Sequence, residues 1–152
     1  YNRYSRIVFY DSLAKKSAYK PTDISAYRLK SARFKADLKS NKFYELEERG
    51  YKVSLYKLKY NPTTSNQYSL ERSGSGVKLS DTSAYEDLGT FYFFYNKNRK
   101  EFFRIPQEGD FQKEVGAFFK DCPDLSKRII DKELKENELS AIMDVYNFIC
   151  DL

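Results

Sequence analysis

The sequence predicts an α+β protein, in which an aromatic-rich, mainly antiparallel β-sheet is followed by a C-terminal three-helix segment. Short runs of β-type composition, separated by turns rich in Gly, Pro, Asn and Ser, occupy residues 1–109. Residues 110–152 instead repeat apolar side chains at helical spacing. Strands first and helices last are typical of this class. We therefore expect an antiparallel β domain at residues 1–109 and a helical C-terminal subdomain, residues 110–152, packed on it.

The strands are expected where aromatic and β-branched residues cluster or alternate with polar ones. Their expected ranges are residues 6–10, 24–30, 32–37, 42–48, 51–60, 67–72, 90–95 and 101–105. We interpret residues 11–20 as a polar connection. The apolar phase shifts within residues 51–60, which indicates a β-bulge or two wetted faces. Gly50, just ahead, suits a hairpin position of positive φ.

Two segments of the β domain differ from the rest in composition. Residues 90–95 carry rings on both faces of the expected strand, so we expect both faces to be covered. Residues 73–89 are mostly small and polar. A structureless loop of this length inside a compact domain is either functional or mobile, and we interpret it as mobile.

The three helices are expected from apolar residues that recur on one helical face. The first starts after Asp110, an N-cap residue type, and the second at Pro123, which suits a first helical turn. Asp121 or Cys122 is expected to cap the second, and the third starts at about residue 136. The expected inward residues are Phe111, Val115, Phe118 and Phe119, then Leu125, Ile129 and Ile130, then Leu139, Ile142, Val145 or Tyr146, and Ile149.

The two cysteines lie at opposite ends of this helical pair. Cys122 opens the second helix and Cys150 closes the third. If these helices are antiparallel, a disulfide is geometrically natural, provided that the Cα atoms come within about 7 Å of each other. Two buried free thiols in a cytosolic protein are the alternative. Two cysteines and no histidine leave too few soft ligands for zinc, so we expect no metal site and no cofactor.

The composition argues against most catalytic chemistry. The absence of histidine removes the commonest general base and the usual catalytic triads. Glu45 and Glu47, with Glu48 beside them, are a carboxylate set of the kind used in glycosidic chemistry. Charges next to a hairpin turn are more typical of a solvated sheet edge. We therefore predict that the protein is not an enzyme, with a glutamate-based enzyme as a third hypothesis.

Basic residues interleaved with tyrosines form a possible anion-binding face. The chain has 27 Lys and Arg against 22 Asp and Glu, a net charge of +5. The residues expected on this face are Lys52, Lys57, Lys59, Arg72, Lys97, Arg99 and Lys100. Such faces bind single-stranded nucleic acid by stacking and backbone attraction, or an anionic glycan or envelope surface. They also arise because exposed sheet faces are often rich in Tyr and Lys.

The sequence leads to two expectations about membrane insertion and targeting. No apolar run approaches the roughly 18 residues that a membrane span needs, so we expect no transmembrane segment in this chain. The first residue is Tyr1 rather than Met, and we expect that an N-terminal portion precedes it.

Three segments occur in an order that matches a known pattern. They are Pro21-Thr22-Asp23-Ile24; Phe43 to Gly50 with Val53-Ser54-Leu55-Tyr56; and Phe119-Lys120-Asp121-Cys122-Pro123-Asp124-Leu125 with Tyr146-Asn147 and Cys150. They resemble a family of exported cell-envelope proteins common in Bacteroidetes, whose C-terminal DCP…YNxxC helical block is the most specific part. The resemblance implies a signal peptide and export, and it favours the disulfide. It supplies neither an activity nor an active site.

These observations together favour a non-enzymatic exported protein, periplasmic or associated with the cell envelope, that serves as a binding or assembly module. Its expected partner is a protein or a glycan of the envelope, of unknown identity. The alternative is a basic-aromatic module that binds nucleic acid or another anionic polymer. Export disfavours nucleic acid as the partner.

Overall fold

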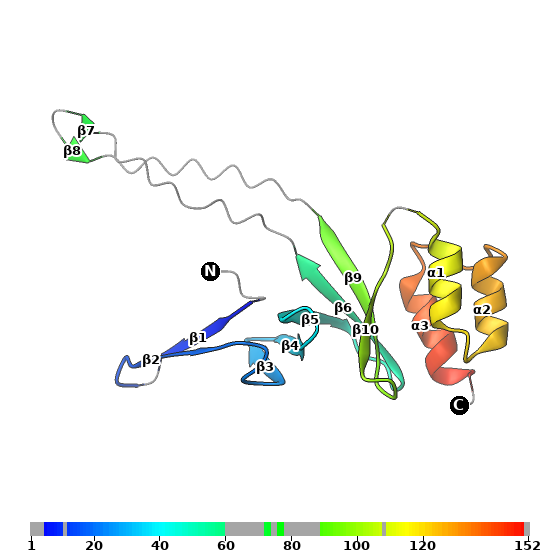
Figure 1. Ribbon diagram of the computed structural model, residues 1–152, viewed down its shortest axis with the longest axis horizontal. Helices are drawn as coiled ribbons and strands as arrows, with labels where there is room; N and C mark the ends of the chain where they lie inside the picture. The colour runs from blue at the N-terminus through cyan, green and yellow to red at the C-terminus, as the bar shows by residue number, and fades with distance from the viewer. Residues whose placement is uncertain are drawn as a thin grey trace.

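The computed structural model describes residues 5–10, 12–59, 72–73, 76–77, 89–107 and 109–150. In chain order the elements are β1 (Ile7–Tyr10), β2 (Lys16–Tyr19), β3 (Ala26–Leu29), β4 (Ala32–Asp37), β5 (Lys42–Glu48), β6 (Val53–Lys59), β7 (Arg72–Ser73), β8 (Gly76–Val77), β9 (Thr90–Asn96), β10 (Glu101–Arg104), α1 (Phe111–Phe118), α2 (Pro123–Ile130) and α3 (Leu139–Phe148). An antiparallel sheet followed by three helices confirms the predicted α+β class (Figure 1).

The main sheet has the strand order β10-β9-β6-β5-β4-β3, and its neighbouring strands are antiparallel. β1 pairs with β2, and β7 with β8, in two separate two-stranded sheets. The expected strand at residues 67–72 lies outside the described residues except for the backbone of Arg72. The expected loop at residues 73–89 also lies outside them, except for residues 73, 76, 77 and 89.

The polar connection expected at residues 11–20 is wrong, because residues 16–19 form β2. β2 pairs with β1 in a register that places Ile7 opposite Tyr19. The ring of Tyr19 meets the ring of Phe9 edge to face at a centroid distance of 5.8 Å. Such a diagonal cross-strand pair stabilises a hairpin, and the strand's own composition gives little sign of it.

The bulge lies on β5 and not within residues 51–60, for which the sequence predicted a bulge or two wetted faces. Leu46 pairs with Tyr56, and Glu48 pairs with the next residue, Leu55, so Glu47 is the additional residue. A bulge on one strand shifts the facing residues relative to their partner. β6 itself alternates regularly against β9, so its phase shift comes from burial on both faces rather than from a bulge or wetted faces. Val53 and Leu55 pack with the helices. Tyr56 and Leu58 pack in the second aromatic cluster on the opposite face.

Both faces of β9 are covered, as the sequence predicts. Phe94 is fully buried against α1, where its ring lies 5.2 Å from that of Phe119. Phe93, the preceding residue, packs on the opposite face against Tyr44 of β5, at 4.2 Å between ring centroids. Figure 1 shows the helices together on one side of β6 and β9, with β3, β4 and β5 on the other.

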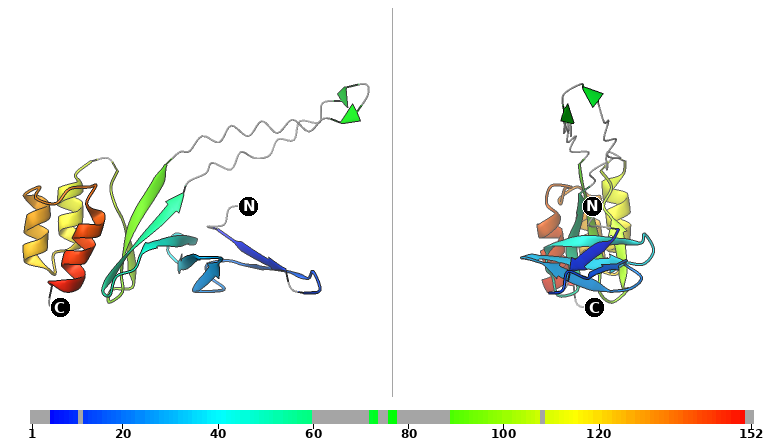
Figure 2. Two further views of the ribbon diagram at one scale, coloured as in Figure 1. Left: turned by 180° about the vertical axis from the view of Figure 1, so that it is seen from behind. Right: turned by 90° about the vertical axis from the view of Figure 1, so that its left-hand side faces the viewer.

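The sheet curls on the face away from the helices. Tyr44 of β5 also contacts Phe102 of β10, at 4.7 Å between ring centroids, although β6 and β9 lie between these strands. Lys35 of β4 similarly reaches the ring of Tyr95 on β9. Contacts across two intervening strands require strong coiling, which both views of Figure 2 show. The result is a concave face, called here the curled face.

α1 and α2 begin where the sequence predicts, whereas α3 begins at Leu139 rather than at about residue 136. Asp110 caps α1 by accepting from the Lys113 backbone N–H at 3.0 Å, and Pro123 opens α2. Two residues expected to face inward do not. Ile130 and Ile149, expected to face inward, are 52 % and 67 % exposed. A Cβ on Gly116 would approach Ile130 Cγ1 to 2.8 Å. Ile130 therefore packs against α1 at Gly116 with one side of its side chain and leaves the rest exposed.

Candidate functional site

The two cysteines meet in the structure. Cys122 and Cys150 form a disulfide with a Cα–Cα distance of 5.6 Å, and both residues are buried. The pairing joins the start of α2 to the turn after α3. Both cysteines of the chain are thus accounted for, and the geometric expectation is confirmed.

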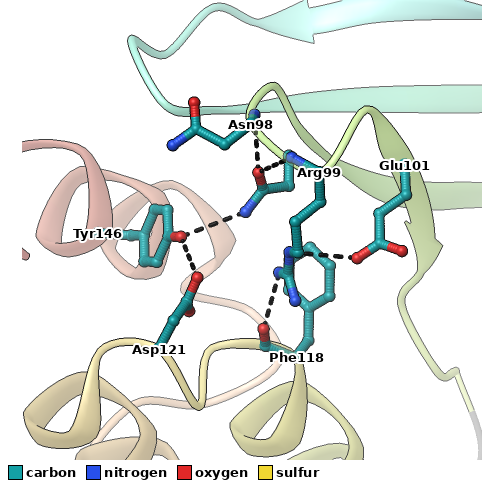
Figure 3. Close-up of polar contacts among 7 residues, drawn as sticks. Asn98, Arg99, Glu101, Phe118, Asp121 and Tyr146 are labelled. Carbon is teal, nitrogen blue, oxygen red and sulfur yellow. Dashed lines mark hydrogen bonds and ion pairs between the residues drawn. The ribbon is translucent and has the colours of Figure 1, made fainter. Parts of the chain in front are cut away.

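The other residues of the C-terminal block also contact one another or the sheet. The Tyr146 hydroxyl donates to Asp121 Oδ2 at 2.8 Å and accepts from Asn96 Nδ2 at 3.2 Å (Figure 3). Asn96 Oδ1 accepts in turn from the backbone N–H groups of Asn98 and Arg99, both at 3.0 Å. Of the two residues expected to cap α2, Cys122 holds the N-cap position without a side-chain cap bond, and the Asp121 carboxylate bonds to Tyr146. Burial, followed by the bond to Asp121, raises the pKa of Tyr146 to about 12.

Asn147 holds the turn between β5 and β6. Its Oδ1 accepts from the backbone N–H groups of Lys52 and Val53 at 2.6 and 2.9 Å, and its Nδ2 donates to the Val53 and Met143 carbonyls at 3.0 and 2.8 Å. A Cβ on Gly50 would lie 2.2 Å from Asn147 Nδ2 and 1.8 Å from the Val53 carbonyl oxygen. Gly50 is not at a positive φ, contrary to expectation. Glycine is needed at position 50 because any Cβ there would overlap the Val53 carbonyl and the Asn147 amide.

Several cations of the predicted basic face make structural contacts. Lys52 Nζ donates to the Cys150 carbonyl, and Lys57 forms an ion pair with Glu47. Arg99 donates to the Phe118 carbonyl at 2.8 Å, pairs with Glu101 at 3.2 Å and lies over the Phe118 ring (Figure 3).

The other four residues of the predicted basic face do not come together in one place. Lys59 is exposed at the end of β6, and the side chain of Arg72 lies outside the described residues. Lys97 and Lys100 alone among the seven line the groove described next.

A groove of about 740 Å³ lies on the curled face and is called here the basic groove. It is bounded by β3 and β4 on one side and by β6, β9 and the turn after β9 on the other. The lining residues are Ala26, Tyr27, Arg28, Arg33, Phe34, Lys35, Leu46, Arg49, Ser54, Tyr56, Tyr95, Lys97 and Lys100. The lining therefore combines Arg and Lys side chains with aromatic rings and includes no carboxylate.

The cations of the basic groove differ in how they are held. Lys35 Nζ lies 4.7 Å from the centroid of the Tyr95 ring, and Lys97 Nζ donates to the Gly50 carbonyl at 2.6 Å. Burial, then the charge of Arg49, lowers the pKa of Lys97. Within the described part of the chain, no carboxylate forms an ion pair with Arg33, Arg49 or Lys100. Their charge is available to an anion from solution.

The rings that line the basic groove are already engaged. Tyr27 stacks on Phe34 at 4.5 Å between centroids. Tyr56 meets Tyr95 edge to face at 6.0 Å. Burial, with a smaller contribution from Tyr95, raises the pKa of Tyr56 to about 12. These rings form the wall of the groove. Tyr95 also holds the charge of Lys35 in place.

The glutamates considered for catalysis lie elsewhere. Glu47 pairs with Lys57, and Glu48 accepts from the Ser140 hydroxyl at 2.6 Å. Glu45 faces Lys57 in the strand register. None of the three lines the basic groove. Across the described residues, no cluster of three or more His, Cys, Asp or Glu is placed to hold a metal ion.

The comparisons with known proteins add no relative. No family model matches the chain, and no curated protein or solved structure matches it significantly. The helices of the described ranges are all too short or too polar to cross a membrane.

Four cations of the basic groove were missed from the sequence. They are Arg28, Arg33, Lys35 and Arg49. Three of the four lie in the β3–β4 hairpin, whose sequence is that of ordinary strands in which polar and apolar residues alternate. Only the curl of the sheet brings this hairpin opposite the turn after β9. A sequence signal exists in part, since residues 28–35 hold four basic residues, Arg28, Lys30, Arg33 and Lys35, and no acidic one.

Proposed function

We propose that this protein is a non-enzymatic, exported binding module of the cell envelope whose ligand is an anionic polymer, an acidic glycan in the first place. One observation carries the ligand class: the basic groove brings Arg28, Arg33, Lys35, Arg49, Lys97 and Lys100 around one concavity that has no carboxylate in its lining. Clefts lined by one sign of charge concentrate ions of the opposite sign.

Export is supported by the cysteines and by the resemblance of the C-terminal block. The buried disulfide is of the kind that persists in oxidising compartments and is rare in the cytosol. The residues that carry the resemblance bond to one another, as Cys122 with Cys150 and Asp121 with Tyr146. A block whose members are joined in this way has a structural reason to recur as a unit.

Nucleic acid is the second candidate, because basic and aromatic residues occur together in the groove. Single-stranded nucleic acid binds such surfaces by laying its bases on open ring faces. Here Tyr27 stacks on Phe34, and Tyr95 carries Lys35. Base stacking would have to displace these contacts, whereas an acidic sugar chain needs only the charges.

Binding to immobilised polygalacturonate, with neutral dextran as the reference surface, tests the ligand class. We expect retention that falls with added salt, since exposed charges are screened. The Arg33→Gln/Arg49→Gln variant should lose about tenfold or more in affinity, equivalent to about 1.4 kcal/mol. The matched control, Lys120→Gln/Lys135→Gln, removes two exposed charges of the helical subdomain and should stay within about twofold of the native protein.

Equal losses in both variants would show that net charge alone is responsible and would contradict the proposal. Tighter binding of a single-stranded oligonucleotide of matched charge would favour the second candidate instead. Export is tested separately with the full-length gene, by alkylating cells that are rapidly quenched in acid. Cys122 and Cys150 should resist alkylation until a reductant is added, and free thiols would contradict export.

A further inference from the structure

A second hollow lies on the same curled face, further along β9 from the turn that follows it. Its volume is about 330 Å³, and it is lined by Lys42, Tyr44, Leu58, Phe91, Phe93 and Arg104. Strand register places it on the face of the basic groove, because Phe91 and Tyr95 are four residues apart on one strand and so point the same way. Phe93 lies between Phe91 and Tyr95 on β9, and so lines the second hollow on the side nearer the basic groove.

The second hollow also has a basic rim. The Arg104 guanidinium lies over the Phe91 ring, 4.4 Å from its centroid, which holds the charge in place. Lys42 comes from β5 and is half-buried. Both residues are far from the turn that supplies Lys97 and Lys100, so the two concavities draw their charges from different elements.

Two carboxylates lie near the second hollow, and neither lines it. Asp37 is opposite Lys42 in the register, but its oxygens accept from the backbone N–H groups of Lys39 and Ser40 at 3.2 and 3.3 Å. Glu114 shares an adjoining depression with Arg104. This end of the curled face is therefore less strongly positive than the basic groove.

The spacing of the two concavities limits what can occupy both. Four residues along an extended strand span about 13 Å, the separation of Phe91 from Tyr95 along β9. A small anion reaches only one concavity. A chain that carries charges on successive units reaches both without bending sharply.

We propose that the second hollow is a second subsite, and that the ligand is a linear acidic polysaccharide that runs along β9 from the Lys97–Lys100 turn to Arg104. This inference rests on the proposed function and adds that the ligand is long enough to occupy two subsites at once. The basic groove binds one acidic stretch of the chain, and Lys42 with Arg104 binds the next. Two linked subsites raise affinity for a long ligand over a short one, because the second contact forms within the complex.

Oligogalacturonates of two and ten sugars, which carry one carboxylate on each sugar, are the probes for this length dependence. With the native protein we expect the ten-sugar chain to bind about tenfold or more tightly than the two-sugar chain. The Lys42→Gln/Arg104→Gln variant should lose most of this gain and keep its affinity for the two-sugar chain within about twofold. The Lys120→Gln/Lys135→Gln control, with the same change in net charge, should keep the gain.

The outcomes separate this inference from the proposed function. If both chain lengths bind equally well, or if the Lys42→Gln/Arg104→Gln variant keeps the length gain, the basic groove is a single site and the second subsite is refuted. If Arg33→Gln/Arg49→Gln has no effect on either chain, the proposed function itself fails. Circular dichroism of each variant, unchanged from the native spectrum, ensures that a loss of binding reflects the removed charge.

Discussion

The two faces of the sheet treat polar groups in opposite ways. On the helical side, the amide of Asn147 and the hydroxyl of Tyr146 are buried, and each makes hydrogen bonds on both its donor and acceptor atoms. On the curled side, Arg33 and Arg49 stand exposed at the groove with no carboxylate of the described residues paired to them. One face satisfies its polar groups internally, while the other leaves charge for a ligand. Stability and binding should therefore respond to substitutions on different faces.

The largest effect should come from the aromatic core of the helical side. Phe119→Ala removes a fully buried ring that contacts Phe94 and Tyr146, and we expect a loss of about 4 kcal/mol in the free energy of unfolding. Phe102→Ala, on the curled side, removes a half-buried ring and should cost about half as much. Urea denaturation of both variants measures the difference. Equal losses would contradict the asymmetry of the two faces.

Breaking the disulfide should have the next largest effect. The bond joins residues separated by 28 positions, and a loop of that size corresponds to about 3.6 kcal/mol in the chain-entropy account. We expect Cys122→Ser/Cys150→Ser to lower the free energy of unfolding by this order, and a reductant to lower it equally in the native protein. The double variant should then be insensitive to the reductant. Its affinity for polygalacturonate should change by less than about twofold if binding belongs to the curled face.

Asn147→Ala tests the link between the helices and the turn beside the groove. The substitution leaves the buried N–H of Val53 without its acceptor, which should cost about 2 kcal/mol. Because Lys97 donates to the Gly50 carbonyl in the same turn, this variant should also weaken binding to polygalacturonate measurably. Leu139→Ala, a change on the same helix without this contact, serves as the control. If both variants bind alike, the turn does not depend on Asn147.

The smallest expected effect is the loss of the Tyr146 contribution to the free energy of unfolding at alkaline pH. The pKa of Tyr146 is raised from 10.0 to about 12 in the folded protein. The unfolded state therefore loses its proton first, and the contribution of Tyr146 to stability is complete below pH 10 and is lost as the pH rises to about 12. Tyr146→Phe should cost about 1 kcal/mol at neutral pH through the lost hydrogen bonds. It should also flatten the decline in stability between pH 10 and 12, as thermal unfolding across that range will show.

The parts of this molecule that could be predicted from sequence depend on short-range patterns. Asp110 and Pro123 mark helix starts through their own backbone chemistry, and the positions of Cys122 and Cys150 follow from helix lengths. The aromatic strand β9 is recognisable because five consecutive residues carry rings. In each case the information lies within a few residues of the feature.

The parts that could not be predicted depend on sheet coiling and register. Nothing near Lys35 indicates that its ammonium group will lie over Tyr95, because β4 and β9 are not neighbours in the sheet. The basic groove combines residues from the β3–β4 hairpin with the turn after β9, and a sequence reading that treats strands singly misses it. Gly50 shows the same limitation in part, since one of the two groups that leave no room for a Cβ there, the Asn147 amide, belongs to a residue near the other end of the chain.

The bond from Val53 to Asn147 has a consequence for the order of folding. The two residues are 94 positions apart, so the turn between β5 and β6 acquires its acceptor only after most of the chain has been made. Contacts of such long range are formed late and slow the search for the native state. Until α3 has been synthesised and has packed on the sheet, the apolar side chains of β6 and β9 that it and the other helices cover therefore stay exposed to solvent.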